Sequence, residues 1–139
     1  MAWVAIAGAA LFLVVALVLA NRFGSDPTLT ASPLIGKPAP TEPMPLQDGS
    51  GEVSVADFEG GIVVVNFWAS WCLGCRTEHP ALLQAADAYE DFGVQFIAIN
   101  YQDDQDNAER FLEELGTGAS TIYAVDQGSA TAFEWGVLG

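Results

Sequence analysis

Residues 62–80 read IVVVNFWASWCLGCRTEHP, and this stretch decides the fold. Its first six residues are apolar and mostly β-branched, apart from one asparagine, which predicts a central strand covered on both faces. The two cysteines of the chain, Cys72 and Cys75, follow almost at once, and a helical pattern begins with them. The stretch therefore predicts a strand, a cysteine-bearing turn and a helix.

Strands and helices alternate outward from this stretch. Upstream, residues 44–47 and 52–55 flank the turn DGSG and predict a short hairpin. The helix after the strand has one apolar stripe that ends before Gly93, formed by Cys75, His79, Leu82, Leu83, Ala86 and Tyr89. Further on, the pattern predicts a strand at 94–100, a helix on Ala108, Phe111, Leu112 and Leu115 that ends at Gly116, a strand at 121–125 and a short helix at 129–135. This order predicts an α/β fold with a parallel sheet and right-handed crossovers.

Composition limits the classes of protein to consider. Hydrophobic residues make up 51% of the 139 residues, which favours a packed domain over a disordered chain. Four Lys and Arg against eighteen Asp and Glu give a formal charge of −14, which would repel a phosphate backbone and excludes nucleic acid as a partner. We interpret the acidity as a solubility feature or an adaptation to salt rather than as a docking surface.

Residues 1–20 are predicted to form a transmembrane anchor. Residues 2–20 carry no charged side chain. At about 1.5 Å per residue, a helix over this run nearly matches a bilayer core of about 30 Å. A cleaved signal peptide is the alternative, but no Lys or Arg precedes the run and its apolar stretch exceeds the usual length of about 7–15 residues. The composition then changes to Pro, Ser, Thr and Gly, so we expect a Pro-rich tether at 21–35 and a folded domain at 36–139.

The two cysteines admit three interpretations. A redox pair is favoured, because the pair opens a helix after a buried strand, where open α/β sheets place their sites. A structural disulfide remains an alternative, although a two-residue spacer closes almost no loop. A metal site also remains, although a closed tetrahedral site needs four ligands and the chain holds one histidine, His79.

The helix start favours a reactive first cysteine. Unpaired N–H groups and a partial positive charge at a helix N-terminus stabilise a thiolate, and cysteines so placed have pKa values lowered from about 8.5 to about 3.5–7.5. In that interpretation Cys72 attacks a partner disulfide, and Cys75, shielded on the apolar stripe, resolves the mixed disulfide.

The run at 63–80, with LIGKPAP at 34–40 and VSVADFEG at 53–60, resembles the membrane-tethered, TlpA-like branch of the thioredoxin superfamily, related to ResA and CcmG. The resemblance covers about residues 34–139. It implies a thioredoxin-like fold and an extracytoplasmic thiol-disulfide oxidoreductase that reduces partner disulfides, for example in cytochrome c maturation. The partners implied are protein thiols and disulfides, apocytochrome c and a membrane electron donor, with no metal or cofactor.

The resemblance also assigns roles to five residues. Cys72 matches the nucleophile and Cys75 the resolving thiol of the redox-active disulfide. Glu78 matches an acidic residue that tunes the cysteines and relays protons. Trp71 matches the aromatic residue beside the nucleophile, and Pro80 the proline that kinks the helix, where it cannot donate a backbone hydrogen bond.

Two departures from the branch stand out. Leu73 and Gly74 separate the cysteines, where relatives commonly carry proline before the second one. Relatives also continue into a cis-proline loop, two antiparallel strands and a closing helix, so the chain is expected to be an incomplete copy of the fold.

A copper chaperone or other metal-binding module of thioredoxin fold is the alternative function. A peroxiredoxin is disfavoured because Ala69 stands where that class needs threonine.

Overall fold

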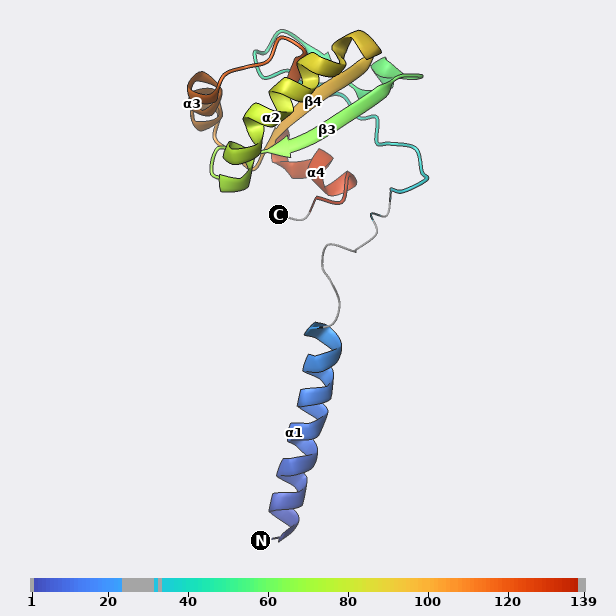
Figure 1. Ribbon diagram of the computed structural model, residues 1–139, viewed down its shortest axis with the longest axis vertical. Helices are drawn as coiled ribbons and strands as arrows, with labels where there is room; N and C mark the ends of the chain where they lie inside the picture. The colour runs from blue at the N-terminus through green and yellow to red at the C-terminus, as the bar shows by residue number, and fades with distance from the viewer. Residues whose placement is uncertain (1, 24–31, 33, 138–139) are drawn as a thin grey trace. The chain divides into compact units, whose positions relative to one another are not determined.

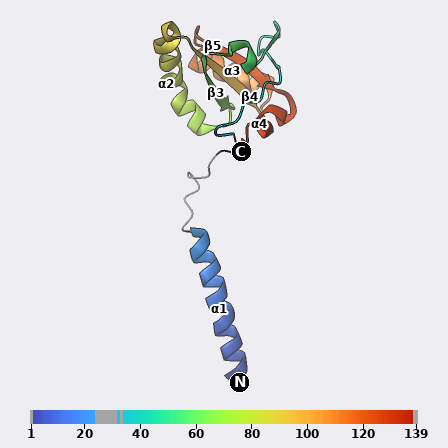
Figure 2. The ribbon, with the colours of Figure 1, turned by 90° about the vertical axis from the view of Figure 1, so that its right-hand side faces the viewer.

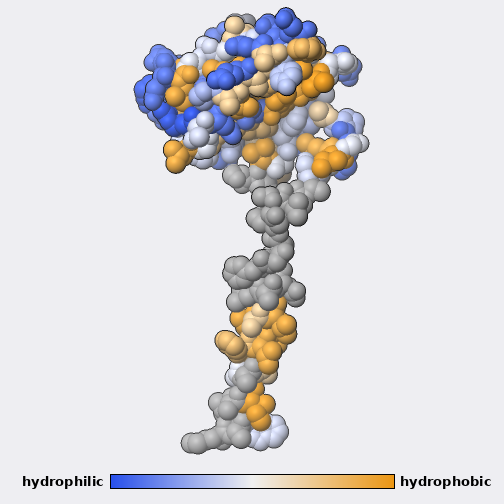
Figure 3. Space-filling view, viewed as in Figure 1, coloured by the Kyte–Doolittle hydropathy of each residue, from blue (hydrophilic) through white to orange (hydrophobic). Residues whose placement is uncertain are grey.

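The computed structural model describes residues 2–23, 32 and 34–137, and the chain divides into two units, Met1–Ile35 and Gly36–Gly139 (Figure 1). In the first unit, helix α1 covers Ala2–Phe23, and Figure 3 colours most of its described surface as hydrophobic. Within the described ranges, no helix combines the length and the hydropathy needed to cross a membrane. Most of the predicted tether falls on 24–31 and 33, which lie outside the described residues.

The second unit contains the predicted parallel sheet. Its strands are β3 (Ile62–Trp68), β4 (Val94–Tyr101) and β5 (Thr121–Asp126), paired in the order β3-β4-β5. Both pairings are parallel, with Phe67 opposite Ile99 and Ile99 opposite Ala124. The three strand predictions are confirmed, and the parallel pairing brings the carboxyl ends of β3 and β4 to one edge of the sheet.

The prediction that residues 62–67 form a central strand buried on both faces is wrong for the described part of the chain. There β3 pairs only with β4, and its residues are half-buried except for Ile62, which is 64% exposed, and Trp68, which is buried. The buried central strand is β4, in which 96–101 are all buried. Both strands are apolar, and that property does not distinguish the centre of a sheet from its edge.

Three α-helices follow the strands, as predicted. Helix α2 covers Leu73–Tyr89 and continues into the 3₁₀ turn η3 (Glu90–Phe92), which Gly93 ends at φ 74°. Helix α3 covers Gln105–Leu115, and its N-cap is Asp104, which accepts backbone N–H bonds from Asp106 and Asn107. After the 3₁₀ turn η4 (Gln127–Ser129), the short helix α4 covers Ala130–Glu134. The buried Asp126 accepts the N–H groups of Thr131 and Ala132 and so caps α4.

The predicted hairpin is present but shorter than expected. Strand β1 (Met44–Pro45) pairs antiparallel with β2 (Glu52–Val53), and the 3₁₀ turn η2 (Val55–Phe58) follows. Ser54 caps η2 through a bond to Ala56, while Asp57 accepts the N–H of Ser54. This reciprocal capping box replaces strand with a turn from residue 54 on.

The core lies on both faces of the sheet. One cluster lies on the face of the sheet that α2 and α3 cover, and it contains Trp68, Cys75, Ala98, Ala108, Phe111 and Leu112. The other lies on the hairpin side and contains Met44, Val53, Ile97, Ile99 and Ala124. Figure 2 shows α2 and α4 on opposite sides of the strands. Alternate residues of β4 serve the two clusters, as expected of a strand covered on both faces.

Candidate active site

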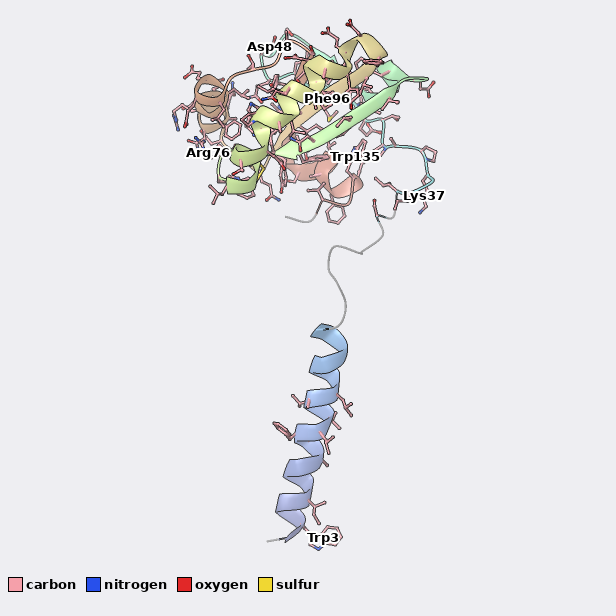
Figure 4. The ribbon with its side chains drawn as sticks, in the orientation of Figure 1. Trp3, Lys37, Asp48, Arg76, Phe96 and Trp135 are labelled. Carbon is pink, nitrogen blue, oxygen red and sulfur yellow. A yellow bond between two sulfur atoms is a disulfide. The ribbon has the colours of Figure 1, made fainter. Side chains whose placement is uncertain are left out.

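The two cysteines lie where β3 gives way to α2. Cys72 is the N-cap of α2, and its Sγ accepts the backbone N–H of Cys75 at 3.1 Å. The two residues form a disulfide with Cα atoms 5.2 Å apart, drawn as a yellow bond in Figure 4. Cys72 is half-buried, whereas Cys75 is 9% exposed and belongs to the core cluster under α2. Cys72 is therefore the more accessible of the two cysteines, and the helix N-terminus is directed at it.

The turn before Cys72 is held by the segment that follows β4. The backbone N–H of Ser70 donates to Asp103 Oδ2 at 2.5 Å, and the Ser70 hydroxyl donates to Asp103 Oδ1 at 2.8 Å. Asn100, buried at the end of β4, donates its amide to Asp103 Oδ2 at 3.1 Å, and the backbone N–H of Asp104 donates to Oδ1 at 3.0 Å. One carboxylate thus accepts four hydrogen bonds beside the cysteines.

These bonds decide the charge state of Asp103. Burial alone raises the pKa of its carboxyl, because it disfavours the charged form. The bonds donated by Ser70, Asn100 and Asp104 outweigh burial and hold that pKa below its ordinary value of 3.8. Asp103 is therefore a carboxylate at neutral pH.

Trp71 lies between Ser70 and Cys72 and is 58% exposed. Its indole N–H donates to the carbonyl of Gln102 at 2.9 Å, and its ring centroid is 6.2 Å from that of Tyr101. The indole ring of Trp71 is therefore exposed to solvent and held in one orientation, and Trp71 is not a core residue. Its predicted supporting role stays a prediction.

Glu78 and Pro80 both lie in α2 with exposed side chains. The helix runs from Leu73 to Tyr89 through Pro80, so the kink that we expected there remains a prediction. No structural observation assigns Glu78 a part in the redox chemistry, and its predicted role also remains untested.

His79 and Arg76 connect α2 to α3 beneath the cysteines. His79 is 7% exposed, its Nε2 is 2.8 Å from the carbonyl oxygen of Gly116, and its ring meets Phe111 edge to face. Arg76 pairs with Glu114 at 2.5 Å and lies over the Phe111 ring, in the region labelled in Figure 4. His79 is thus a packed interior residue. Across the described residues, no group of three or more metal-ligating side chains comes together, so no structural observation favours the metal-site alternative.

Sequence reasoning missed Ser70, Asn100 and Asp103. A signal was available, because an asparagine ends the buried strand at position 100 and a pair of acidic residues, at 103–104, follows it. In a parallel sheet the segments that follow neighbouring strands meet at the same edge, which is where the cysteines had been placed.

Comparisons with known proteins agree with this geometry. The model of a protein family described as the AhpC/TSA family matches residues 35–139. The chain belongs to the AhpC/TSA family. A thiol:disulfide interchange protein DsbE from Pseudomonas fluorescens biotype C is 39% identical over 113 residues, which is 81% of this chain and 61% of that protein. Another DsbE, from Allochromatium vinosum, is 34% identical over 130 residues, 93% of this chain and 70% of the relative.

A solved structure extends the likeness to the fold. The crystal structure of a thiol:disulfide interchange protein of the thioredoxin family from Chlorobium tepidum superposes with a TM-score of 0.59 at 25% identity, covering 73% of this chain and 68% of that one. This AhpC/TSA family member therefore has the thioredoxin-like α/β fold that the resemblance implied. The chain covers 61% of the length of its Pseudomonas relative, or about three fifths.

Proposed function

We propose that the chain is a thiol-disulfide oxidoreductase that acts on disulfides of partner proteins. The observation that carries the proposal is the cysteine pair at the start of α2, with Cys72 at the N-cap and Cys75 buried one turn further on. The relatives named thiol:disulfide interchange proteins support the same activity.

The exchange takes place in two steps, each of which breaks one sulfur–sulfur bond and forms another. In the reduced chain, the Cys72 thiolate attacks one sulfur of a partner disulfide, so a mixed disulfide forms and one partner thiolate leaves. The Cys75 thiolate then attacks Cys72 Sγ, which breaks the mixed disulfide and releases the second partner thiolate. Two electrons have passed to the partner, and the chain carries the Cys72–Cys75 disulfide seen in the structure. A dithiol donor must reduce it again.

An insulin-reduction assay tests the activity. With dithiothreitol as electron donor, the full chain should accelerate reduction of insulin, and Cys72→Ser should abolish the acceleration. Reduced Cys75→Ser, freed of dithiothreitol and then mixed with insulin, should instead accumulate a mixed disulfide that is visible on a non-reducing gel, because the resolving thiol is missing. If the wild-type chain melts cooperatively but reduces insulin no faster than dithiothreitol alone, the proposal fails.

A more specific part of the proposal concerns the direction of electron transfer and the identity of the partner proteins, and it rests on the TlpA-like resemblance. We infer that the chain works as a reductant outside the cytoplasm, on apocytochrome c, and receives electrons from a membrane donor. A reduction potential near about −270 mV, measured in a redox buffer, would support a reductant, whereas one near about −120 mV would indicate an oxidant.

We also propose that residues 1–20 anchor the chain to a membrane. The support is the uncharged run at 2–20 in the sequence. A charged residue at the centre of a membrane helix costs about 2.5–3.5 kcal/mol on insertion scales. The wild-type chain should therefore stay with membranes in alkaline carbonate, and Leu13→Arg should release a larger fraction than the matched change Leu13→Ala. Equal release of all three forms would contradict the anchor.

A further inference from the structure

The turn that leads into Cys72 is short and closed. The backbone N–H of Cys72 donates to the carbonyl of Ala69 at 3.1 Å, which makes Ser70 and Trp71 the two central residues of a turn. Both central residues are tied to the segment after β4: Ser70 to Asp103 by two bonds and Trp71 to the Gln102 carbonyl by one. The turn before Cys72 is therefore held by the segment that follows β4, about thirty residues away in the sequence.

The segment that holds the turn is itself fixed. Gln102 has a φ of 49°, a region that residues other than glycine seldom adopt, and this conformation accompanies the bond from its carbonyl to Trp71. Asn100 and the backbone of Asp104 both donate to the Asp103 carboxylate, in addition to Ser70. The carboxylate accepts four hydrogen bonds, and every group that faces it is a donor. An asparagine at 103 would therefore place its own NH₂ donor against at least one of these donors.

We propose that Asp103 is a positioning residue of the redox pair, which holds the Ser70–Trp71 turn so that Cys72 stays in register with Cys75 and thereby favours the disulfide over the dithiol. The inference rests on the proposed function, because it assigns a role in setting the equilibrium of that same pair. Asp103 acts through Ser70, which donates two hydrogen bonds to its carboxylate.

The direction of the effect follows from two arguments. A held turn raises the effective concentration of one thiol at the other and so stabilises the disulfide. A carboxylate beside the turn also disfavours the Cys72 thiolate, which weakens the reduced form. Loss of Asp103 should therefore shift the balance toward the dithiol on both counts. The reaction measured is the reduction of the Cys72–Cys75 disulfide by two glutathione thiols, which yields the dithiol and oxidised glutathione.

The test measures this equilibrium constant for the full chain in glutathione buffers, with thiols trapped by alkylation and resolved on gels. Asp103→Asn should raise the constant on the order of tenfold. Ser70→Ala keeps every charge and the backbone bond but removes one donor, and it should raise the constant about threefold. Added to Asp103→Asn, Ser70→Ala should have almost no further effect, because the two changes remove the same contact.

Asp104→Asn is the matched control. It removes the same charge one residue away, asparagine caps a helix as well as aspartate does, and the Asp104 side chain bonds α3 rather than the turn. Its constant should stay within about twofold of the wild type. Equal shifts in Asp103→Asn and Asp104→Asn would show a long-range charge effect and overturn the proposal, as would unchanged constants in Asp103→Asn and Ser70→Ala. If Asp103→Asn does not fold, the Ser70→Ala result decides. A wild-type pair that never exchanges with glutathione would instead refute the proposed function, and this inference with it.

Discussion

Cys72 is the nucleophile of the proposed function, and its N-cap position predicts an acidic thiol. In Cys75→Ser, where Cys72 is free, the rate of alkylation by iodoacetamide should rise with pH around a midpoint below the ordinary value of about 8.5. The cause is the backbone N–H of residue 75 and the partial charge of the helix end, both directed at Cys72 Sγ. The same variant unfolded in urea serves as the control and should return to about 8.5. Identical midpoints in the folded and unfolded protein would rule out activation by the helix.

Glu78 offers a second prediction at the same scale, from its match to the acidic residue of the TlpA-like branch. If Glu78 relays protons to the cysteines, Glu78→Gln should slow exchange by about tenfold or more and flatten its pH profile, because the amide cannot take up or release a proton. Stopped-flow measurement of insulin reduction against pH checks both effects. Glu113→Gln removes a comparably exposed helical carboxylate on α3 and should leave the profile unchanged. Matching pH profiles for Glu78→Gln and Glu113→Gln would show that Glu78 is a solvated surface carboxylate with no part in proton transfer.

Among the elements, α3 supports the site through Phe111. This side chain is 1% exposed and its ring centroid lies 4.7 Å from that of Trp68, at the end of β3, and 5.2 Å from that of His79 on α2. Phe111→Ala should lower the free energy of unfolding by about 3–5 kcal/mol, through lost burial and the cavity left behind. Urea unfolding followed by circular dichroism measures the loss. Phe133→Ala, at a position that is 76% exposed, should change it by no more than about 0.5 kcal/mol, and similar losses in both variants would contradict this account of the core.

The elements also show where sequence reasoning succeeds and where it stops. Hydrophobic period and glycine positions predicted each strand of the sheet and the helix after each one, because those signals are local. They did not predict that β4 rather than β3 is the central strand, since pairing joins residues such as Phe67 and Ile99 that are distant in sequence. The same limit hid the bond between Ser70 and Asp103, whereas the cysteine pair was found because its spacing is local.

At the scale of the whole molecule, charge is strongly unbalanced. The chain has eighteen acidic residues and four basic ones, while the described residues contain a single ion pair, between Arg76 and Glu114. Hydrophilic residues cover much of the face of the second unit that is visible in Figure 3. Net repulsion among carboxylates therefore outweighs attraction between opposite charges, and it opposes the compact state.

This imbalance predicts that salt stabilises the protein. Raising NaCl from about 0.01 to about 1 M shortens the Debye length from about 30 to about 3 Å, which screens repulsion between carboxylates across the surface. The melting temperature of the full chain at pH 7, in a non-ionic detergent, should rise by about 4–8 °C, the shift expected from about 1 kcal/mol. Near pH 4.1, where the sequence carries no net charge, the same addition should have almost no effect. A melting temperature at pH 7 that falls or stays constant with NaCl would mean that attractive pairs dominate, because screening weakens attraction and repulsion alike.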